Sequence, residues 1–153
     1  QPHFRNFNKR VVKTPKLYFY DTGLACSLLE IRSEAQLKTH YLRGALFENL
    51  ILAELIKERY NKGLRNNCYF WRDNKGVEID CIIDTGEKLI PVEIKSADTF
   101  DKEFFRNIKY WNNLSGNPPD NSYLIYGGNN SADTKEGKLV SWREFNNLFG
   151  IGY

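Results

Sequence analysis

Apolar side chains recur at three- and four-residue intervals through residues 41–60, and this spacing predicts an amphipathic α-helix. Gly63 follows the last of them, at a place where helices commonly end. Asp21 or Thr22 can cap a shorter helix that begins after an apolar run. The helices predicted along the chain span residues 22–29, 41–60, 99–112 and 142–149.

Short runs of β-branched and aromatic residues between these helices predict strands. In chain order they are residues 68–71, 77–85, 88–95, 122–126 and 138–142, and a short β-prone run lies at residues 17–20. The run at 122–126 is short and apolar, as expected of a buried central or parallel strand. The succession of helix, three-strand meander, helix, two strands and helix predicts an α/β fold, with a mixed central β-sheet flanked by helices.

A two-residue turn between the second and third strands of the meander predicts their register. Gly86 can adopt the positive φ that a type II′ turn requires at its first central position. Thr85 is then the partner of Lys88, and every pair further along the hairpin follows from that one.

Four charged residues of this hairpin fall on one predicted face. The register places Asp80 opposite Glu93 and Glu78 opposite Lys95. Because side chains alternate from face to face along a strand, all four share a face, and the apolar side chains between them fill the other.

Two carboxylates that face each other across strands repel unless a cation lies between them. The oxygens of Asp80 and Glu93 suit Mg²⁺ or Mn²⁺, with a backbone carbonyl and waters completing the coordination. Lys95 would then orient or deprotonate an attacking water and offset charge on a pentacovalent phosphate. Glu48 lies on the apolar face of its predicted helix, and a metal site would explain a carboxylate there. The alternative is an exposed charge ladder, with Glu48 reaching solvent.

Positive charge is concentrated at the start of the chain. The chain carries a net charge of +3, yet its first 16 residues contain five basic residues and no acid: Arg5, Lys9, Arg10, Lys13 and Lys16. A basic arm with interleaved aromatic residues can follow a phosphate backbone, which makes these five residues candidate nucleic-acid contacts. The alternative, which so few charges favour, is a solvated tail or the end of a preceding domain.

Other chemistries are disfavoured by composition. Two histidines, His3 and His40, do not support a zinc site or a histidine-based triad. Three cysteines without Cys-x-x-Cys spacing are expected to be reduced thiols of a cytoplasmic protein, and no apolar run approaches the roughly 20 residues that cross a bilayer. The chain contains no Met, even at position 1, which we interpret as a sign that it is a fragment.

The segments Ile79-Asp80 and Val92-Glu93-Ile94-Lys95 resemble the Asp…Glu-x-Lys signature of the restriction-endonuclease-like, PD-(D/E)xK nuclease superfamily. Ile79 replaces the proline of that signature. The resemblance implies a restriction-endonuclease-like fold and Mg²⁺ as cofactor. It also implies a role for an acidic residue on the first core helix, a position that Glu48 matches.

Between residues 9 and 145 the chain also resembles domain of unknown function 4143, which is found C-terminal to an AAA-type ATPase module in many bacterial and archaeal proteins. The resemblance rests on four segments: Pro15 to Ala25, Arg43 to Asn49, Glu78 to Asp80 and Glu93 to Lys95. It implies that residues 1–16 are a linker from a missing upstream ATPase region and that residues 17–153 form the restriction-endonuclease-like domain. No Walker-type phosphate loop is present, so no ATP binding is expected of this chain.

The expected function is a Mg²⁺-dependent (or Mn²⁺-dependent), nuclease-like DNA-processing domain attached to that ATPase. Asp80, Glu93 and Lys95 are its candidate catalytic residues, and Asp80, Glu93 and Glu48 its candidate metal ligands. DNA and the upstream ATPase domain are the expected partners, with no role for a membrane. The alternative is a catalytically silent module that binds DNA or protein for the ATPase.

Overall fold

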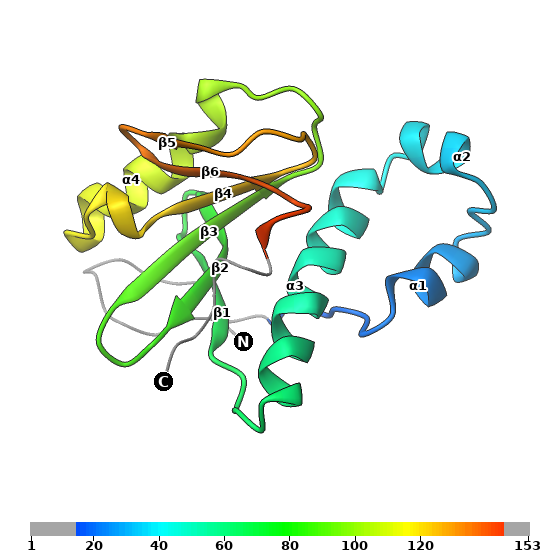
Figure 1. Ribbon diagram of the computed structural model, residues 1–153, viewed down its shortest axis with the longest axis horizontal. Coiled ribbons are helices and arrows are strands. Elements are labelled where there is room, and N and C mark those ends of the chain that lie inside the picture. Colours follow the sequence, from blue (N-terminus) through cyan, green and yellow to red (C-terminus); the bar gives the residue numbers. More distant parts are fainter. Residues whose placement is uncertain (1–14, 146–153) are drawn as a thin grey trace. The chain divides into compact units, whose positions relative to one another are not determined.

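The structure is a computed structural model that describes residues 15–145 and divides the chain into two compact units. The helical unit is Leu17–Asn66, and the sheet unit consists of Gln1–Lys16 together with Asn67–Tyr153 (Figure 1). Half of the helix predicted at 142–149, residues 146–149, lies outside the described residues, as do four of the five basic residues near the start: Arg5, Lys9, Arg10 and Lys13.

The helical unit contains three helices: α1 (Thr22–Leu28), α2 (Glu34–Thr39) and α3 (Arg43–Asn61). Asp21 caps α1, since its side chain accepts the backbone N–H of Leu24 at 3.0 Å, as predicted. The long helix is confirmed as α3. Six-residue α2 was not predicted, because one and a half turns are too short to show a helical period.

The β-prone run at residues 17–20 does not form a strand, and Asn49 of α3 takes the place of a neighbouring strand. Its Oδ1 accepts the N–H of Phe19 at 2.7 Å, and its Nδ2 donates to the Phe19 carbonyl at 2.9 Å. The same amide nitrogen donates to Thr22 Oγ1 at 2.8 Å. A buried carboxamide thus satisfies both backbone groups of Phe19 that a strand partner would otherwise satisfy.

The sheet unit is built on six strands: β1 (Cys68–Arg72), β2 (Glu78–Asp84), β3 (Leu89–Lys95), β4 (Tyr123–Tyr126), β5 (Ala132–Thr134) and β6 (Gly137–Ser141). Their order is β1-β2-β3-β4-β6-β5 (Figure 1). The first three strands are antiparallel, β3, β4 and β6 are parallel, and β5 returns antiparallel to β6. The predicted mixed sheet of an α/β fold is confirmed. Strand β5 was not predicted, because its three residues lack an alternating apolar pattern.

One helix covers a face of this sheet. The predicted segment 99–112 forms a short 3-10 turn, η1 (Lys102–Phe105), followed by α4 (Arg106–Ser115). A second 3-10 turn, η2 (Pro119–Asn121), leads into β4. Side chains of α4 and η1 pack with those of five strands in one core cluster: Trp71, Ile79, Ile82, Leu89, Phe105, Ile108, Trp111, Leu124, Tyr126 and Leu139.

Two tryptophans are core residues, and the cysteines are reduced thiols, as predicted. Trp71 and Trp111 are fully buried in the core cluster. The three cysteines are free thiols, with Cys68 and Cys81 buried and Cys26 partly buried. Within residues 15–145, no helix is both long enough and apolar enough to cross a bilayer.

Candidate functional site

The register predicted for the β2–β3 hairpin is confirmed near its turn. Gly86 has a φ of 83°, which a type II′ turn requires and which costs glycine little. The N–H of Thr85 donates to the Lys88 carbonyl at 3.1 Å. Four pairs then follow in the predicted register, from Asp84 opposite Leu89 to Cys81 opposite Val92.

A β-bulge interrupts β2 immediately beyond these pairs. On β1, Tyr69 pairs with Ile82 and Trp71 with Ile79, so the intervening β1 residue faces two residues of β2, Asp80 and Cys81. The strict alternation predicted for β2 is therefore wrong at this point. Ile79 and Ile82 lie three residues apart yet pack in the same core cluster, which a regular strand does not allow.

Asp80 contacts β3 through its side chain and not as a paired backbone residue. The N–H of Ile94 donates to Asp80 Oδ2 at 2.8 Å. Backbone pairing ends one residue earlier, at Cys81 and Val92, so Asp80 and Glu93 are not themselves a strand pair. The Asp80 carboxylate takes the place of a backbone acceptor between β2 and β3, and this hydrogen bond holds Asp80 beside Glu93 and Lys95.

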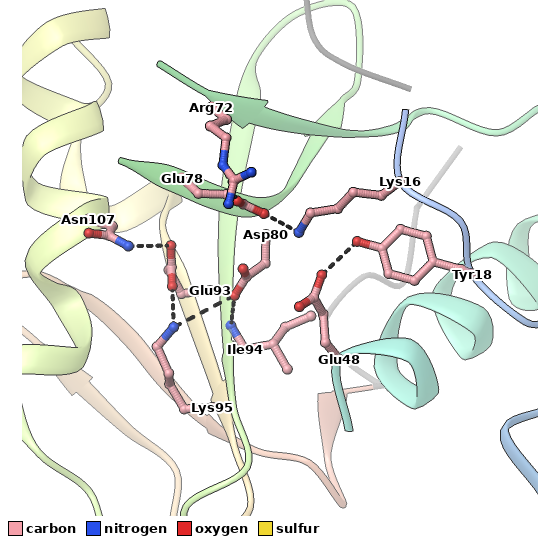
Figure 2. A network of polar contacts seen from close by, with 10 residues as sticks. All are labelled: Lys16, Tyr18, Glu48, Arg72, Glu78, Asp80, Glu93, Ile94, Lys95 and Asn107. Carbon is pink, nitrogen blue, oxygen red and sulfur yellow. Dashed lines mark hydrogen bonds and ion pairs between the residues drawn. The ribbon is translucent and has the colours of Figure 1, made fainter. Parts of the chain in front are cut away.

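The side chains of Asp80, Glu93 and Lys95 meet, as predicted (Figure 2). Lys95 Nζ lies 2.6 Å from Glu93 Oε2 and 3.8 Å from Asp80 Oδ2. Asn107, in the first turn of α4, donates to Glu93 Oε1 at 3.5 Å. Sequence reasoning missed Asn107, because no spacing connects a helix residue with a strand 14 positions earlier.

Burial makes Glu93 the unusual acid of this group. Its side chain is 1% exposed, against 13% for Asp80 and 33% for Lys95. Loss of solvation and the negative charge of Asp80 raise the pKa of Glu93 to about 8, although Lys95 and Asn107 favour its ionised form. Among the described residues, the Lys95 ammonium thus lies within ion-pair distance of both carboxylates, of which Glu93 is almost fully buried.

This donor set fits a hard divalent cation. Both carboxylates offer oxygen ligands, and together with Lys95 they carry one formal negative charge in excess when all three are ionised. The Lys95 ammonium shows that this position already attracts a cation. Asp80 and Glu93 are therefore the described residues of the sheet unit that would hold Mg²⁺ or Mn²⁺.

The raised pKa of Glu93 predicts that stability falls with rising pH. The folded protein holds the proton to about pH 8, whereas an unfolded chain releases it near 4.5. The contribution of Glu93 protonation to the free energy of unfolding is complete below pH 4.5 and is lost as pH rises to about 8. Between these values the free energy of unfolding falls by up to about 1.4 kcal/mol per pH unit. Urea unfolding of the metal-free protein between pH 5 and 9 would measure it.

Glu93→Gln should flatten this pH profile, because glutamine does not titrate. Glu87→Gln, which changes an exposed carboxylate in the hairpin turn, is the matched control and should leave the profile as it is. A profile that is the same in wild type and Glu93→Gln would show that Glu93 is ionised throughout this range.

Two further acids were predicted to lie near this group, Glu78 on the same hairpin face and Glu48 on the apolar face of its helix. Glu78 pairs with Arg72 of β1 and forms ion pairs with Arg72 and Lys16. Its predicted position opposite Lys95 lies beyond the last β2–β3 pair, Cys81 with Val92, and stays a prediction. Glu48 is partly buried on α3, where Tyr18 donates to its Oε1 at 2.6 Å. The role of Glu48 as a metal ligand stays a prediction.

Comparison with known families identifies the domain. Residues 43–145 match the family model described as "Domain of unknown function (DUF4143)", which is more than half of the chain. The chain belongs to the DUF4143 family. Asp80, Glu93, Lys95 and Asn107 all lie within the DUF4143 match, and so does Glu48. Residues 1–35 match a second model, "Domain of unknown function (DUF8612)".

Two curated mycobacterial proteins are similar to this DUF4143 domain. They are the uncharacterized protein Rv2008c of Mycobacterium tuberculosis and the uncharacterized protein Mb2031c of Mycobacterium bovis. Each is 32% identical over 98 residues, which is 64% of this chain and 21% of the relative. The chain therefore matches about a fifth of the length of either protein. No solved structure matches the chain.

Proposed function

We propose that this DUF4143 domain is a Mg²⁺- or Mn²⁺-dependent, nuclease-like DNA-processing domain. The observation that carries the proposal is the meeting of Asp80, Glu93 and Lys95 where the β2–β3 pairing ends. A surface charge ladder accounts for it poorly, because Glu93 is almost completely buried, and burying a carboxylate is costly.

Each residue has a role that its position supports. Asp80 and Glu93 would hold the cation through carboxylate oxygens, with Asp80 kept in place by the Ile94 N–H and Glu93 by Asn107. A bound divalent cation would supply Lewis acidity toward a phosphodiester oxygen. Lys95 Nζ would orient the attacking water, accept its proton when neutral, and offset the negative charge that develops on phosphorus when protonated.

The finer fold and its setting belong to the same proposal. A mixed sheet with the acid–lysine group on adjacent central strands supports a restriction-endonuclease-like fold. We place the domain beside an AAA-type ATPase in the full protein and in the cytoplasm, where DNA and ATP are available. Three free thiols agree with a reducing compartment.

The direct test is DNA cleavage by the purified protein. Supercoiled plasmid, single-stranded DNA and a branched junction would be incubated with Mg²⁺ or Mn²⁺, and with EDTA as the metal-free control. We expect nicking or cutting of at least one substrate with metal and none with EDTA. If the protein neither binds these metals nor cuts any substrate, the catalytically silent DNA- or protein-binding module is the better account.

A further inference from the structure

A second charged group lies next to the acid–lysine group in the sheet unit. Glu78 of β2 forms an ion pair with Arg72 of β1, whose Nε is 2.7 Å from Glu78 Oε2. Lys16 forms an ion pair with the other carboxylate oxygen of Glu78, and its ammonium lies 5.7 Å from the centre of the Phe70 ring. The Glu78 carboxylate thus forms ion pairs with two cationic side chains, those of Arg72 and Lys16, as Figure 2 shows.

The two groups are adjacent and carry opposite formal charges. Glu78 and Asp80 are two residues apart, and a carboxylate oxygen of one lies within 4.8 Å of a carboxylate oxygen of the other. Glu78 with Arg72 and Lys16 has one positive charge in excess, whereas Asp80 and Glu93 with Lys95 have one negative charge in excess when all three are ionised. The acid–lysine group therefore suits a cation, and the adjacent group of Glu78, Arg72 and Lys16 suits an anion.

Within the group of Glu78, Arg72 and Lys16, Arg72 is the residue best placed to bind an anion. Glu78 is 13% exposed and holds the arginine across the strand pair, yet the Arg72 side chain remains 48% exposed. A guanidinium carries five N–H donors in a planar fork, and its contact with Glu78 through Nε does not use them all. The arginine is thereby anchored at one edge and open to solvent at another.

We propose that Arg72 is a DNA-phosphate-binding residue that Glu78 positions beside the candidate metal site. The planar fork of arginine matches two oxygens of a phosphate, a geometry that the point charge of lysine does not reproduce. A contact of this kind positions the DNA strand and carries no base specificity. This inference rests on the proposed function, since it assigns DNA as the ligand at the edge of that site.

The test is DNA binding under conditions that prevent cutting. Fluorescence anisotropy with labelled single-stranded, duplex and branched DNA would be measured in Ca²⁺ over a series of salt concentrations. We expect Arg72→Gln to weaken binding of the preferred DNA about 10-fold and to lower the salt slope by about 1. Calorimetric affinity for Mg²⁺ should stay within about twofold of wild type, because Arg72 contacts neither Asp80 nor Glu93.

Two variants separate a specific contact from loss of charge. Lys88→Gln removes one positive charge at the far end of the β2–β3 hairpin and should leave DNA affinity within about twofold of wild type. Arg72→Lys keeps the charge and the partner Glu78 but loses the fork, and it should recover only part of the lost affinity. If Arg72→Gln does not fold, Arg72→Lys carries the test.

The outcomes distinguish this inference from the proposed function. Equal DNA affinity of wild type and the Arg72 variants would refute the role of Arg72, even if wild type cuts DNA in Mg²⁺. Binding that depends on Arg72 without any cutting would support the role and count against the nuclease. A wild-type protein that binds Mg²⁺ but none of the DNA probes would refute both.

Discussion

Glu93→Gln is expected to lower the affinity for Mg²⁺ by at least about 100-fold and to abolish cleavage, while the protein remains folded. The substitution keeps the shape of the side chain but removes its negative charge and one oxygen ligand. Asp80→Asn should have the same effect, because its amide oxygen still accepts the Ile94 N–H and so preserves the junction between β2 and β3. Calorimetric titration with Mg²⁺ and Mn²⁺ would measure the loss.

Stability in the absence of metal distinguishes a binding site from a structural ion cluster. If Asp80, Glu93 and Lys95 exist to hold the fold together, removing either acid should destabilise the protein. If they form a metal site, Glu93→Gln should be neutral or stabilising above pH 8, because a buried carboxylate beside the negative charge of Asp80 is replaced by a neutral amide. Urea unfolding at pH 8.5 decides between the two.

The matched control is Glu103→Gln, which neutralises an exposed carboxylate in η1. It should leave metal affinity, cleavage and stability close to those of wild type. Unchanged Mg²⁺ affinity in both Glu93→Gln and Asp80→Asn would remove these residues from the metal site, and with them the basis of the nuclease proposal.

Lys95→Met is expected to lower the cleavage rate by about 100-fold or more while metal binding is retained. The Lys95 ammonium lies between the two carboxylates and competes with a cation for them, so Mg²⁺ affinity should stay the same or increase. If Lys95 served only to shape the metal site, Lys95→Met would weaken Mg²⁺ binding. Measuring the cleavage rate together with Mg²⁺ affinity therefore separates the two roles.

Metal should also reverse the effect of Lys95→Met on stability. Without metal, losing the shared counter-ion of Asp80 and Glu93 should cost about 2 kcal/mol at pH 8, a value reduced because Lys95 is one-third exposed. Saturating Mg²⁺ should restore most of this, since it binds the folded state alone. Lys88→Met, at the far end of the hairpin, is the control and should show neither effect. Wild-type cleavage by Lys95→Met would refute the assigned role of Lys95.

Much of the fold follows from short-range patterns in the sequence. The apolar spacing that predicts a helix at 41–60 corresponds to α3, and Gly86 predicts the turn that sets the register of β2 and β3. The meeting of Asp80, Glu93 and Lys95 was also predicted, because helical and strand periods and tight turns depend on residues that are neighbours in sequence.

The tertiary structure decided what depends on partners that are distant in sequence. Asn49 binds both backbone groups of Phe19, so the β-prone run at residues 17–20 does not form a strand. Near the bulge in β2, the Asp80 side chain accepts the Ile94 N–H of β3. Asn107 reaches Glu93 only because α4 packs on the sheet. No local preference encodes these contacts, since each one arises when packing brings two polar groups together out of water, where both must find a partner.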